Sequence, residues 1–177
     1  MDEQTPVAMI RDDLRSLPRF ELPKPYTLRM YEPGDAACWT EIQQQSDVYL
    51  HDTEGLFVRA FKNNYTALTE RQFYLMDGAG RAIGTATAWF DNNYCSKVFG
   101  RVHWVAILPA MQGRGLSKPL MAAVCERLHE LDHRRAYLTT AALRIPAIRL
   151  YVKFGFCPHI RSDSDRQAWD SIADRIK

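Results

Sequence analysis

A glycine-rich turn between an apolar run and an amphipathic segment is the feature that most restricts how this chain folds. The apolar run extends from Val102 to Leu108, the turn reads Gln112-Gly113-Arg114-Gly115-Leu116-Ser117, and the amphipathic segment extends from Leu116 to Leu131. This order predicts a strand, a loop and a helix. Glycine lets a ligand approach the backbone closely, and the first turn of a helix has unpaired N–H groups and a partial positive charge. The turn therefore predicts a binding site for an anionic cofactor.

Two common nucleotide-binding loops do not fit this turn. It contains neither G-x-G-x-x-G nor G-x-x-x-x-G-K-[ST], which argues against a dinucleotide site and against a nucleoside triphosphate site. A glycine turn that only connects a strand to a helix is the structural alternative.

Length and composition indicate a single main domain. The chain has 177 residues, of which 46% are hydrophobic, enough for one core but too few for two large domains. We expect residues 1–25 to form an N-terminal helix and an extended arm, and residues 26–177 to form one domain. The helix is predicted from apolar residues at helical spacing and the arm from prolines. These residues are Val7, Ile10, Leu14 and Leu17, followed by Pro18, Pro23 and Pro25.

The charge and the apolar runs suggest no nucleic-acid or membrane partner. The chain has 23 basic and 21 acidic residues, a net charge of +2, which does not favour a nucleic-acid-binding protein. No apolar run reaches the roughly 20 residues that span a bilayer, and the start Met1 to Pro6 lacks the profile of a signal peptide. We expect a cytoplasmic protein, and the sequence leaves open whether it is a monomer or a homodimer.

Metal chemistry is not expected. The four cysteines have no spacing that suggests a zinc site or a redox pair, so we expect buried free thiols at Cys38, Cys95, Cys125 and Cys157. The segment from His129 to His133 spells H-E-x-x-H, the signature of zinc proteases. On a helix, however, both histidines lie opposite the apolar stripe and face water, and no third ligand follows.

The remaining pattern alternates short strands with helices. Strands are expected near 26–31, 72–76, 82–90, 100–108, 137–140 and 156–160, and the second and third of these form a hairpin through Asp77 to Gly80. Helices are expected from Asp35 to about Gln45, over 53–62, after the glycine turn, and over 146–154 with Gly155 as its stop. Trp169, Ile172 and Ile176 indicate a C-terminal helix, capped by Ser162 or Asp163.

A second landmark joins the glycine turn about 30 residues downstream. It reads Ala147-Ile148-Arg149-Leu150-Tyr151-Val152-Lys153-Phe154-Gly155-Phe156. The turn and this helix together resemble the Q/R-x-x-G-x-G/A loop and the A-x-x-L-Y-x-x-x-G-F helix of the GNAT superfamily of acetyl-CoA-dependent N-acyltransferases. The resemblance implies an α/β (α+β) fold with a mixed, mostly antiparallel sheet flanked by helices, including extra N- and C-terminal helices. It also implies a sheet that splays open near the turn and holds coenzyme A in the gap.

The resemblance implies roles for residues of the turn and of the strand before it. Backbone N–H groups of Gln112, Gly113, Arg114, Gly115, Leu116 and Ser117 would hold the pyrophosphate, and Arg114 would add charge. Val105, Ala106 and Ile107 match the strand that pairs with the pantetheine arm in the manner of an added strand. Lys118, Arg149 and Lys153 are candidates for the 3′-phosphate, or are ordinary solvated charges.

Acetyl transfer by direct attack requires a neutral amine, donors for the developing oxyanion and a proton for the departing thiolate. Tyr151 matches the family tyrosine credited with protonating the sulfur, and a phenol with a pKa of about 10 carries its proton at neutral pH. An aromatic anchor is the alternative role for Tyr151.

His103 is the candidate general base, directly or through water. It lies two residues before Val105, where several small-amine acetyltransferases of this superfamily have histidine or glutamate; a strand histidine satisfied by a neighbour is the alternative. Tyr31, Glu32 and Asp91 are further candidates for the base. Arg101 shares the predicted strand face of His103 and is a candidate for orienting an acidic acceptor.

The resemblance implies transfer of an acetyl group from acetyl-CoA to a primary amine of a small molecule, without a metal. The alternatives are a non-catalytic acyl-CoA-binding regulatory module, and acetylation of a protein N-terminus or lysine. Ser117 and Arg144 depart from the usual glycine or alanine and the usual asparagine, and the second change leaves one family contact in doubt. The acceptor and the acyl length are not predicted. The aromatic residues of 32–68 and 90–99 are candidates either for an acceptor wall or for core.

Overall fold

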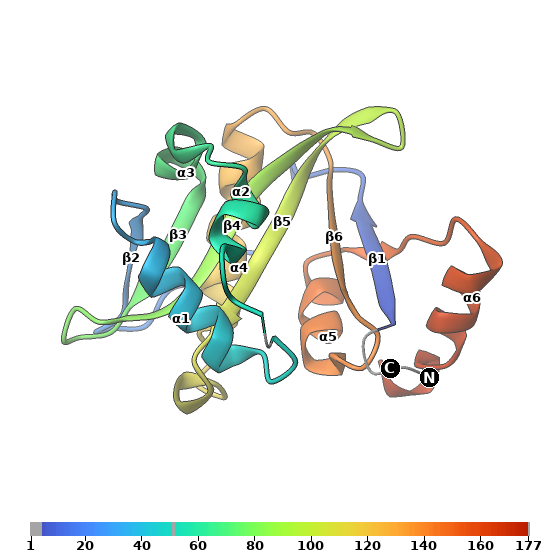
Figure 1. The fold of residues 1–177 in the computed structure, drawn as a ribbon. Helices are drawn as coiled ribbons and strands as arrows, with labels where there is room; N and C mark the ends of the chain where they lie inside the picture. The colour runs from blue at the N-terminus through green and yellow to red at the C-terminus, as the bar shows by residue number, and fades with distance from the viewer. Residues whose placement is uncertain (1–4, 51, 177) are drawn as a thin grey trace. The chain divides into compact units, whose positions relative to one another are not determined.

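The computed structural model describes residues 5–50 and 52–176 and places seven strands of that part in the hydrogen-bonded order β2-β3-β4-β5-β6-β1-β7 (Figure 1). Strand β1 pairs antiparallel with β6 and β7, and β3 pairs antiparallel with β2 and β4, whereas β5 and β6 are parallel. The expected mixed, mostly antiparallel sheet with flanking helices is therefore confirmed. The chain forms two compact units, here called the loop unit and the terminal unit and described one at a time.

The loop unit contains residues 19–89 and 102–127. Its strands are β2 (Thr27–Met30), β3 (Gln72–Met76), β4 (Ala82–Tyr94) as far as Trp89, and β5 (Lys97–Ile107) from Val102. Its helices are α1 (Ala36–Ser46), α2 (Leu56–Phe61), α3 (Tyr65–Arg71) and α4 (Ser117–Glu130), the last as far as Arg127. Helix α3 is absent from the sequence expectations, and α2 is shorter than the predicted 53–62.

The predicted hairpin joins β3 to β4. The Asp77 carboxylate accepts hydrogen bonds from the backbone N–H groups of Ala79 and Arg81, and Gly80 has a φ of 77°. Asp and Gly favour such a turn because the carboxylate closes it locally and glycine adopts positive φ without strain. The hairpin register pairs Tyr74 with Thr85.

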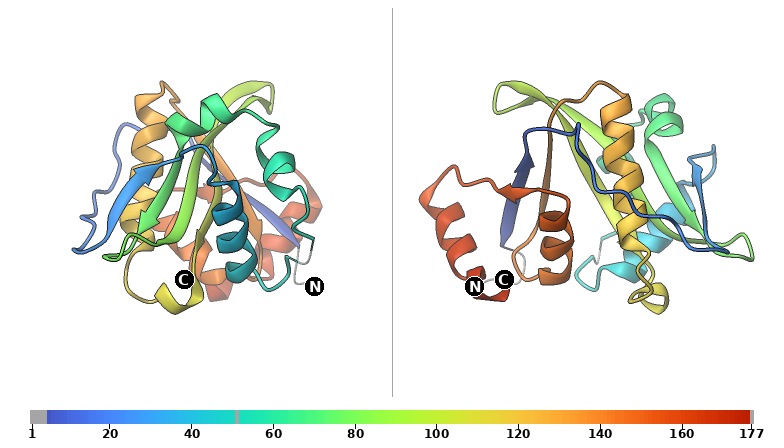
Figure 2. Two further views of the ribbon diagram at one scale, coloured as in Figure 1. Left: turned by 60° about the vertical axis from the view of Figure 1, so that its left-hand side comes forward. Right: turned by 180° about the vertical axis from the view of Figure 1, so that it is seen from behind.

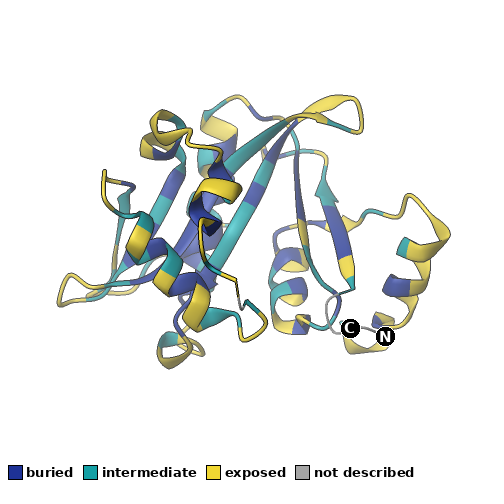
Figure 3. Cartoon of the chain, in the orientation of Figure 1, coloured by how far each residue is buried: buried dark blue, intermediate teal, exposed yellow. Residues whose placement is uncertain are grey.

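Helices cover both faces of the sheet in the loop unit. Helices α1 and α2 lie on one face and α4 lies on the other (Figures 1 and 2). The buried positions follow the strands and the inward sides of these helices (Figure 3). Fully buried core residues include Trp39, Phe61, Leu75, Ile83, Leu120 and Val124.

The terminal unit contains the described residues up to Pro18, residues 90–101, and the described residues from Leu128 onward. Its strands are β1 (Pro6–Arg11), the first part of β5, β6 (Ala136–Ala141) and β7 (Cys157–Pro158), and its helices are α5 (Ile145–Lys153) and α6 (Asp163–Asp170). The predicted cap at Ser162 is confirmed, because its side chain accepts from the Asp165 backbone N–H at 3.1 Å. A 3-10 turn, Ala173–Arg175, follows α6 where the C-terminal helix was expected to continue.

The predicted N-terminal helix is wrong, because Pro6–Arg11 is strand β1. This strand pairs with β6 and β7, and Met9 is fully buried. Helical spacing of apolar residues is a weak signal over a short segment, and a strand with neighbours on both sides gains more hydrogen bonds and burial than an isolated helix. Residues 1–4 of the expected helix and arm lie outside the described residues. The single-domain assignment of 26–177 stays a prediction.

No helix within residues 5–50 and 52–176 has the length and apolar character needed to cross a bilayer.

Candidate cofactor and catalytic site

The glycine loop has the open backbone that a bound anion requires. It follows the 3-10 turn η1 (Pro109–Met111) and leads into α4, and Gly113 and Gly115 have φ values of 75° and 77°. A Cβ atom built on either glycine would meet no atom within 4 Å. Both glycines therefore meet a conformational need, and their Cβ positions face open space beside the main chain.

The loop also supplies hydrogen-bond donors. Within the described part of the chain, no hydrogen bond is donated by the backbone N–H groups of residues 113–117. The Gln112 N–H does donate, to the Pro109 carbonyl oxygen at 3.2 Å. Of the backbone N–H groups predicted to bind the pyrophosphate, that of Gln112 is therefore already used. The remaining candidates are those of Gly113, Arg114, Gly115, Leu116 and Ser117. These N–H groups lie at the N-terminus of a fourteen-residue helix, where the helix dipole favours an anion. The residues present therefore fit a diphosphate.

The strand segment Val105–Ile107 is bracketed by two glutamine side chains. Before it, Gln43 Nε2 of α1 donates to the Trp104 carbonyl oxygen at 3.1 Å. After it, Gln112 Nε2 donates to the Ile107 carbonyl oxygen at 2.9 Å. Val105 is half-buried, whereas Ala106 and Ile107 are 8% and 9% exposed. The proposed pantetheine strand is thus held at both ends by side chains of the same unit.

Trp104 interrupts the extended backbone of β5. Its φ is 51°, in the left-handed region that bulky residues rarely occupy. Such a conformation costs about 1–3 kcal/mol and persists only where the surroundings impose it. The indole packs edge to face on Trp39, with ring centroids 5.2 Å apart. Neither the role of Gln43 nor this conformation has a local sequence signal, so neither was predicted from the sequence.

The candidate base His103 lies immediately before Trp104 and is half-buried among aromatic rings. Its ring centroid is 5.8 Å from that of Phe61 and 5.7 Å from that of Trp104. Phe61 in turn packs edge to face on Trp89 at 5.3 Å. His103 therefore packs against two aromatic rings, and its role as general base stays a prediction.

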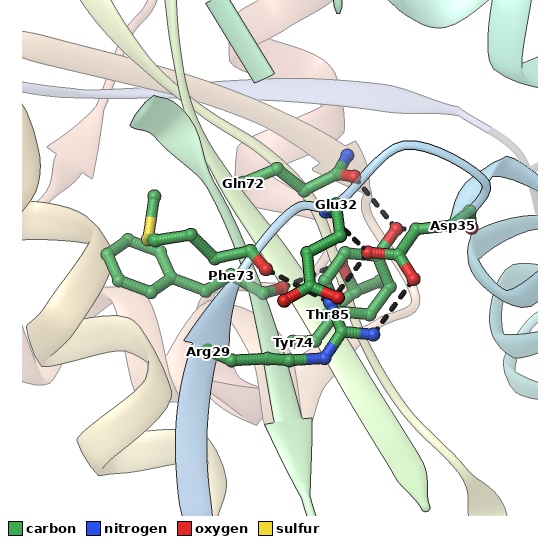
Figure 4. Close-up of polar contacts among 8 residues, drawn as sticks. Arg29, Glu32, Asp35, Gln72, Phe73, Tyr74 and Thr85 are labelled. Atoms are coloured by element: carbon green, nitrogen blue, oxygen red, sulfur yellow. Dashed lines mark hydrogen bonds and ion pairs between the residues drawn. The ribbon is translucent and has the colours of Figure 1, made fainter. Parts of the chain in front are cut away.

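The alternative bases Tyr31 and Glu32 adjoin a polar network that fixes the start of α1 (Figure 4). Arg29 donates to both carboxylate oxygens of Asp35, at 2.6 and 2.8 Å. Burial alone raises the pKa of Asp35, but the hydrogen bonds from Arg29 and from the Glu32 backbone outweigh burial and leave that pKa below its ordinary value. Burial raises the pKa of Tyr31, which makes a phenolate base less accessible. Glu32 is exposed.

Buried side chains of β3 and β4 extend the same network beneath α1. Tyr74 donates its hydroxyl to Gln72 Oε1 at 2.9 Å, and Gln72 Nε2 donates to Thr87 Oγ1 at 3.2 Å. The Tyr74 hydroxyl also lies 3.3 Å from the Asp35 carbonyl oxygen. Tyr74, Gln72 and Thr87 are all fully buried. Because buried polar groups are costly unless paired, this network favours one position of α1.

Tyr151, the candidate acid, lies on α5 in the terminal unit and is described apart from the glycine loop. Pro146 stands in the first turn of α5, and Gly155, with a φ of 73°, follows its end as predicted. The Tyr151 side chain is 8% exposed. The Arg11 guanidinium donates to the Phe154 carbonyl oxygen, which ties β1 to the end of this helix. The catalytic role of Tyr151 stays a prediction.

A second polar cluster of the terminal unit includes the other two candidates, Asp91 and Arg101. The Tyr137 hydroxyl donates to Asp91 Oδ2 at 3.0 Å, and burial raises the pKa of Tyr137. Arg101 lies over the Tyr137 ring, 5.5 Å from its centroid, and its buried Nε has no partner among the described residues. Tyr94 stacks on Tyr137 at 3.7 Å. The Asp91 carboxylate is therefore already an acceptor within the fold.

Two expectations about metal ligands and thiols need correction. His129 is exposed as predicted, but His133 is 9% exposed and buried, because α4 ends at Glu130 and Asp132 has a φ of 62°. The helical geometry assumed for H-E-x-x-H therefore stops before its second histidine. Only one thiol is fully buried: Cys125 is buried and Cys38 half-buried, whereas Cys95 and Cys157 are exposed. Within the described ranges, no three His, Cys, Asp or Glu residues are grouped to hold a metal.

The aromatic residues of the expected acceptor region divide between core and surface. Phe57 and Phe61 are buried at 5% and 0% exposure, whereas Tyr49 and Tyr65 are about half exposed. The basic candidates for the 3′-phosphate also differ: Lys118 lies over the Phe20 ring, Arg149 donates to the Arg175 carbonyl oxygen at 2.8 Å, and Lys153 is exposed. Arg144, at the usual asparagine position, is exposed.

The chain is similar to known acetyltransferases in sequence and fold. The profile of the Acetyltransferase (GNAT) family matches residues 19–156. Mycothiol acetyltransferase of Pseudarthrobacter chlorophenolicus is 29% identical over 149 residues, 79% of this chain and 45% of the relative. Mycothiol acetyltransferase of Streptomyces griseus is 26% identical over 142 residues, 78% of this chain and 45% of the relative. This chain thus spans less than half the length of either relative.

Among solved structures, a GCN5-related N-acetyltransferase from Sphaerobacter thermophilus has a TM-score of 0.73 at 20% identity, covering 87% of this chain and 48% of that chain. This likeness shows a shared fold.

Proposed function

This chain belongs to the Acetyltransferase (GNAT) family, and from that premise we propose that it transfers an acetyl group from acetyl-CoA to a primary amine of a small molecule. The observation that carries this proposal is the open loop at Gly113 and Gly115, with the undonated N–H groups of residues 113–117 beside it. Both features suit a diphosphate. The names of the two relatives refer to a small molecule, which supports a small-molecule acceptor here.

Acetyl-CoA, when bound, would supply a thioester whose carbonyl carbon an amine can attack. The protein's part is to bind, orient and move protons. The N–H groups of residues 113–117 hold the diphosphate, with Arg114 adding a positive charge, and the backbone of Val105–Ile107 orients the pantetheine arm. No protein nucleophile is needed, because the amine attacks directly once both substrates are held together.

Two side chains are assigned to proton transfer. His103 accepts a proton from the acceptor ammonium, directly or through water, and thereby frees the attacking lone pair. Tyr151 donates its phenolic proton to the thiolate that departs as the C–S bond breaks. The proton that the newly acylated nitrogen loses restores the phenol, directly or through water. Among the alternative bases, burial weakens the case for Tyr31, and the hydrogen bond from Tyr137 already occupies Asp91.

Calorimetry with coenzyme A tests the loop without knowledge of the acceptor. Gly115→Val places a branched side chain in the open space beside the loop and should abolish binding. Gly80→Val is the matched control, since Gly80 has the same φ of 77° and the same empty surroundings but lies in the β3–β4 turn. It should retain binding. Equal affinity in wild type and Gly115→Val would overturn the loop assignment.

A mass-spectrometric screen of amines with acetyl-CoA tests the reaction itself. An acetylated small amine supports the proposal. Binding of coenzyme A with no product from any amine would favour the non-catalytic module, and products formed only on peptide N-termini or lysines would favour a protein acceptor.

A further inference from the structure

We propose that Gln43 is a positioning residue that holds the Trp104 backbone in its left-handed conformation and so sets the geometry of the cofactor strand. This inference rests on the proposed function, because it takes Val105–Ile107 as the segment that receives coenzyme A. It assigns a role to a residue on α1 that is remote in sequence from both family motifs.

The unusual φ of Trp104 requires a contact that imposes it. The indole Nε1 of Trp104 is buried and has no hydrogen-bond partner among the described residues, so the side chain offers no polar anchor. The packing partner Trp39 likewise has a buried Nε1 without a partner in that part of the chain. The ring pair with Trp39 orients the Trp104 side chain, whereas the hydrogen bond from Gln43 to the Trp104 carbonyl oxygen acts directly on the peptide unit.

The Gln43 side-chain amide, which donates this hydrogen bond, is buried. Gln43 is 4% exposed, so the hydrogen bond from its amide competes little with water. Its neighbours Gln44 and Gln45 on the same helix are both exposed, and the Gln45 amide bonds to Glu41 instead. Among these three consecutive glutamines, Gln43 is the one that faces the sheet, together with Trp39 and Ile42.

Helix α1, which carries Gln43, is held in place at its start. The start of α1 is anchored to β2 and β3 by the Arg29–Asp35 pair and by the contact of the Tyr74 hydroxyl with the Asp35 carbonyl oxygen (Figure 4). Gln43 lies eight residues after Asp35, two helical turns farther along, and Trp39 lies midway on the same side. Anchoring of the helix start therefore fixes how far the Gln43 amide reaches toward β5.

The consequence extends in both directions along β5. His103 precedes Trp104, and Val105 follows it, so one peptide orientation sets the direction of both the proposed base and the proposed pantetheine strand. Gln112 holds the other end of the segment at Ile107. Without the Gln43 hydrogen bond, Trp104 is expected to relax toward the extended region, which turns the N–H and C=O groups of Val105 away from their binding orientation.

The test compares Gln43→Met with Gln44→Met. Methionine keeps the length and flexibility of glutamine but removes the donor. In Gln43→Met, we expect coenzyme A affinity by calorimetry to fall about tenfold, since a buried peptide carbonyl loses its partner. Gln44→Met should leave affinity unchanged. The three-bond HN–Hα coupling and the Cα shift of Trp104, measured without any ligand, should move toward extended values only in Gln43→Met.

A double-mutant cycle separates an effect of Gln43 on the Trp104 conformation from a general loss of stability in Gln43→Met, because a general loss would persist in a Trp104→Gly background. Glycine adopts positive φ without strain, so in a Trp104→Gly background the substitution of Gln43 should change affinity less than about twofold. The difference from the roughly tenfold loss expected in the wild-type background measures the coupling between Gln43 and Trp104. If the wild-type protein binds no coenzyme A, the proposed function is overturned. The three-bond HN–Hα coupling constant of Trp104 then still decides whether Gln43 holds its conformation. If Gln43→Met keeps both the wild-type affinity for coenzyme A and the wild-type HN–Hα coupling constant of Trp104, the inference is overturned.

Discussion

A Cβ atom on Gly84 would lie 2.9 Å from the Ala106 carbonyl oxygen, so β4 and the Val105–Ile107 segment of β5 meet where a side chain cannot fit. The same atom would lie 3.1 Å from Ile107 Cγ1. Because the nearest atom belongs to the backbone, β5 itself must shift to accept a methyl group. The size of the side chain at position 84 therefore controls the position of Val105–Ile107.

Gly84→Ala should accordingly lower both stability and coenzyme A affinity. Overpacking of this kind costs about 1–3 kcal/mol of unfolding free energy, measurable by chemical denaturation. Gly78→Ala is the control, because its Cβ would lie 2.8 Å from Pro25 Cγ at the hairpin, away from the cofactor strand. The control should lose stability and keep its affinity. Unchanged coenzyme A affinity in a folded Gly84→Ala protein would contradict the prediction.

Asp35→Asn should destabilise the protein at neutral pH and lose this effect in acid. The folded-state pKa of Asp35 lies below its ordinary 3.8, so its stabilising contribution is present above the ordinary value and disappears as pH falls through the folded value. We expect a deficit of roughly 1–2 kcal/mol near pH 7. Urea unfolding at several pH values measures the difference between wild type and variant.

Asp52→Asn provides the matched comparison for Asp35→Asn. Asp52 pairs with Arg59 at 3.1 Å, but the two side chains are 75% and 53% exposed, and exposed pairs contribute little. Its substitution should leave stability unchanged at every pH. A deficit for Asp35→Asn that persists undiminished below pH 3 would refute the electrostatic explanation.

The glycine loop and the α5 helix were predictable because their signals are local. Pro146 stands in the first turn of α5 and Gly155 follows its end, and the positive φ of Gly113 and Gly115 is the conformation that glycine spacing suggests. Turn chemistry of this kind depends on neighbouring residues in the chain. Strand β1 depends on partners more than 100 positions away, as when Met9 pairs with Leu138, and its own apolar spacing favours the wrong structure.

The site features that were missed share the same cause. The contact from Gln43 to Trp104 spans 61 positions, and three consecutive glutamines give no hint of which one is buried. The burial of His133 depends on the end of α4 at Glu130, and helix ends are the least predictable part of an element. Long-range packing decides such features, and no local pattern encodes it.

Tyr151→Phe should lower kcat with little change in coenzyme A affinity. The ring is buried and phenylalanine preserves its packing, so the substitution removes the hydroxyl that is the proposed proton donor. General acid catalysis contributes about 100-fold or more, and a stopped assay of the acetylated amine measures the loss. Tyr137→Phe removes a similarly buried hydroxyl from the same unit and should retain wild-type kcat. If kcat falls in Tyr137→Phe but not in Tyr151→Phe, the proton donor would instead belong to the polar cluster that contains Tyr137 and Asp91.

His103→Gln should change the pH dependence of kcat/KM as well as its size. If a neutral imidazole removes the ammonium proton, the wild-type rate falls as acid protonates His103, and glutamine, which does not titrate, removes that limb of the profile. The amine's own ionisation remains and shapes the residual profile, so two acceptors of different basicity should be compared. An acid limb that stays at the same pH for both acceptors in the variant would assign the base to another group, with the exposed Glu32 the next to test by Glu32→Gln.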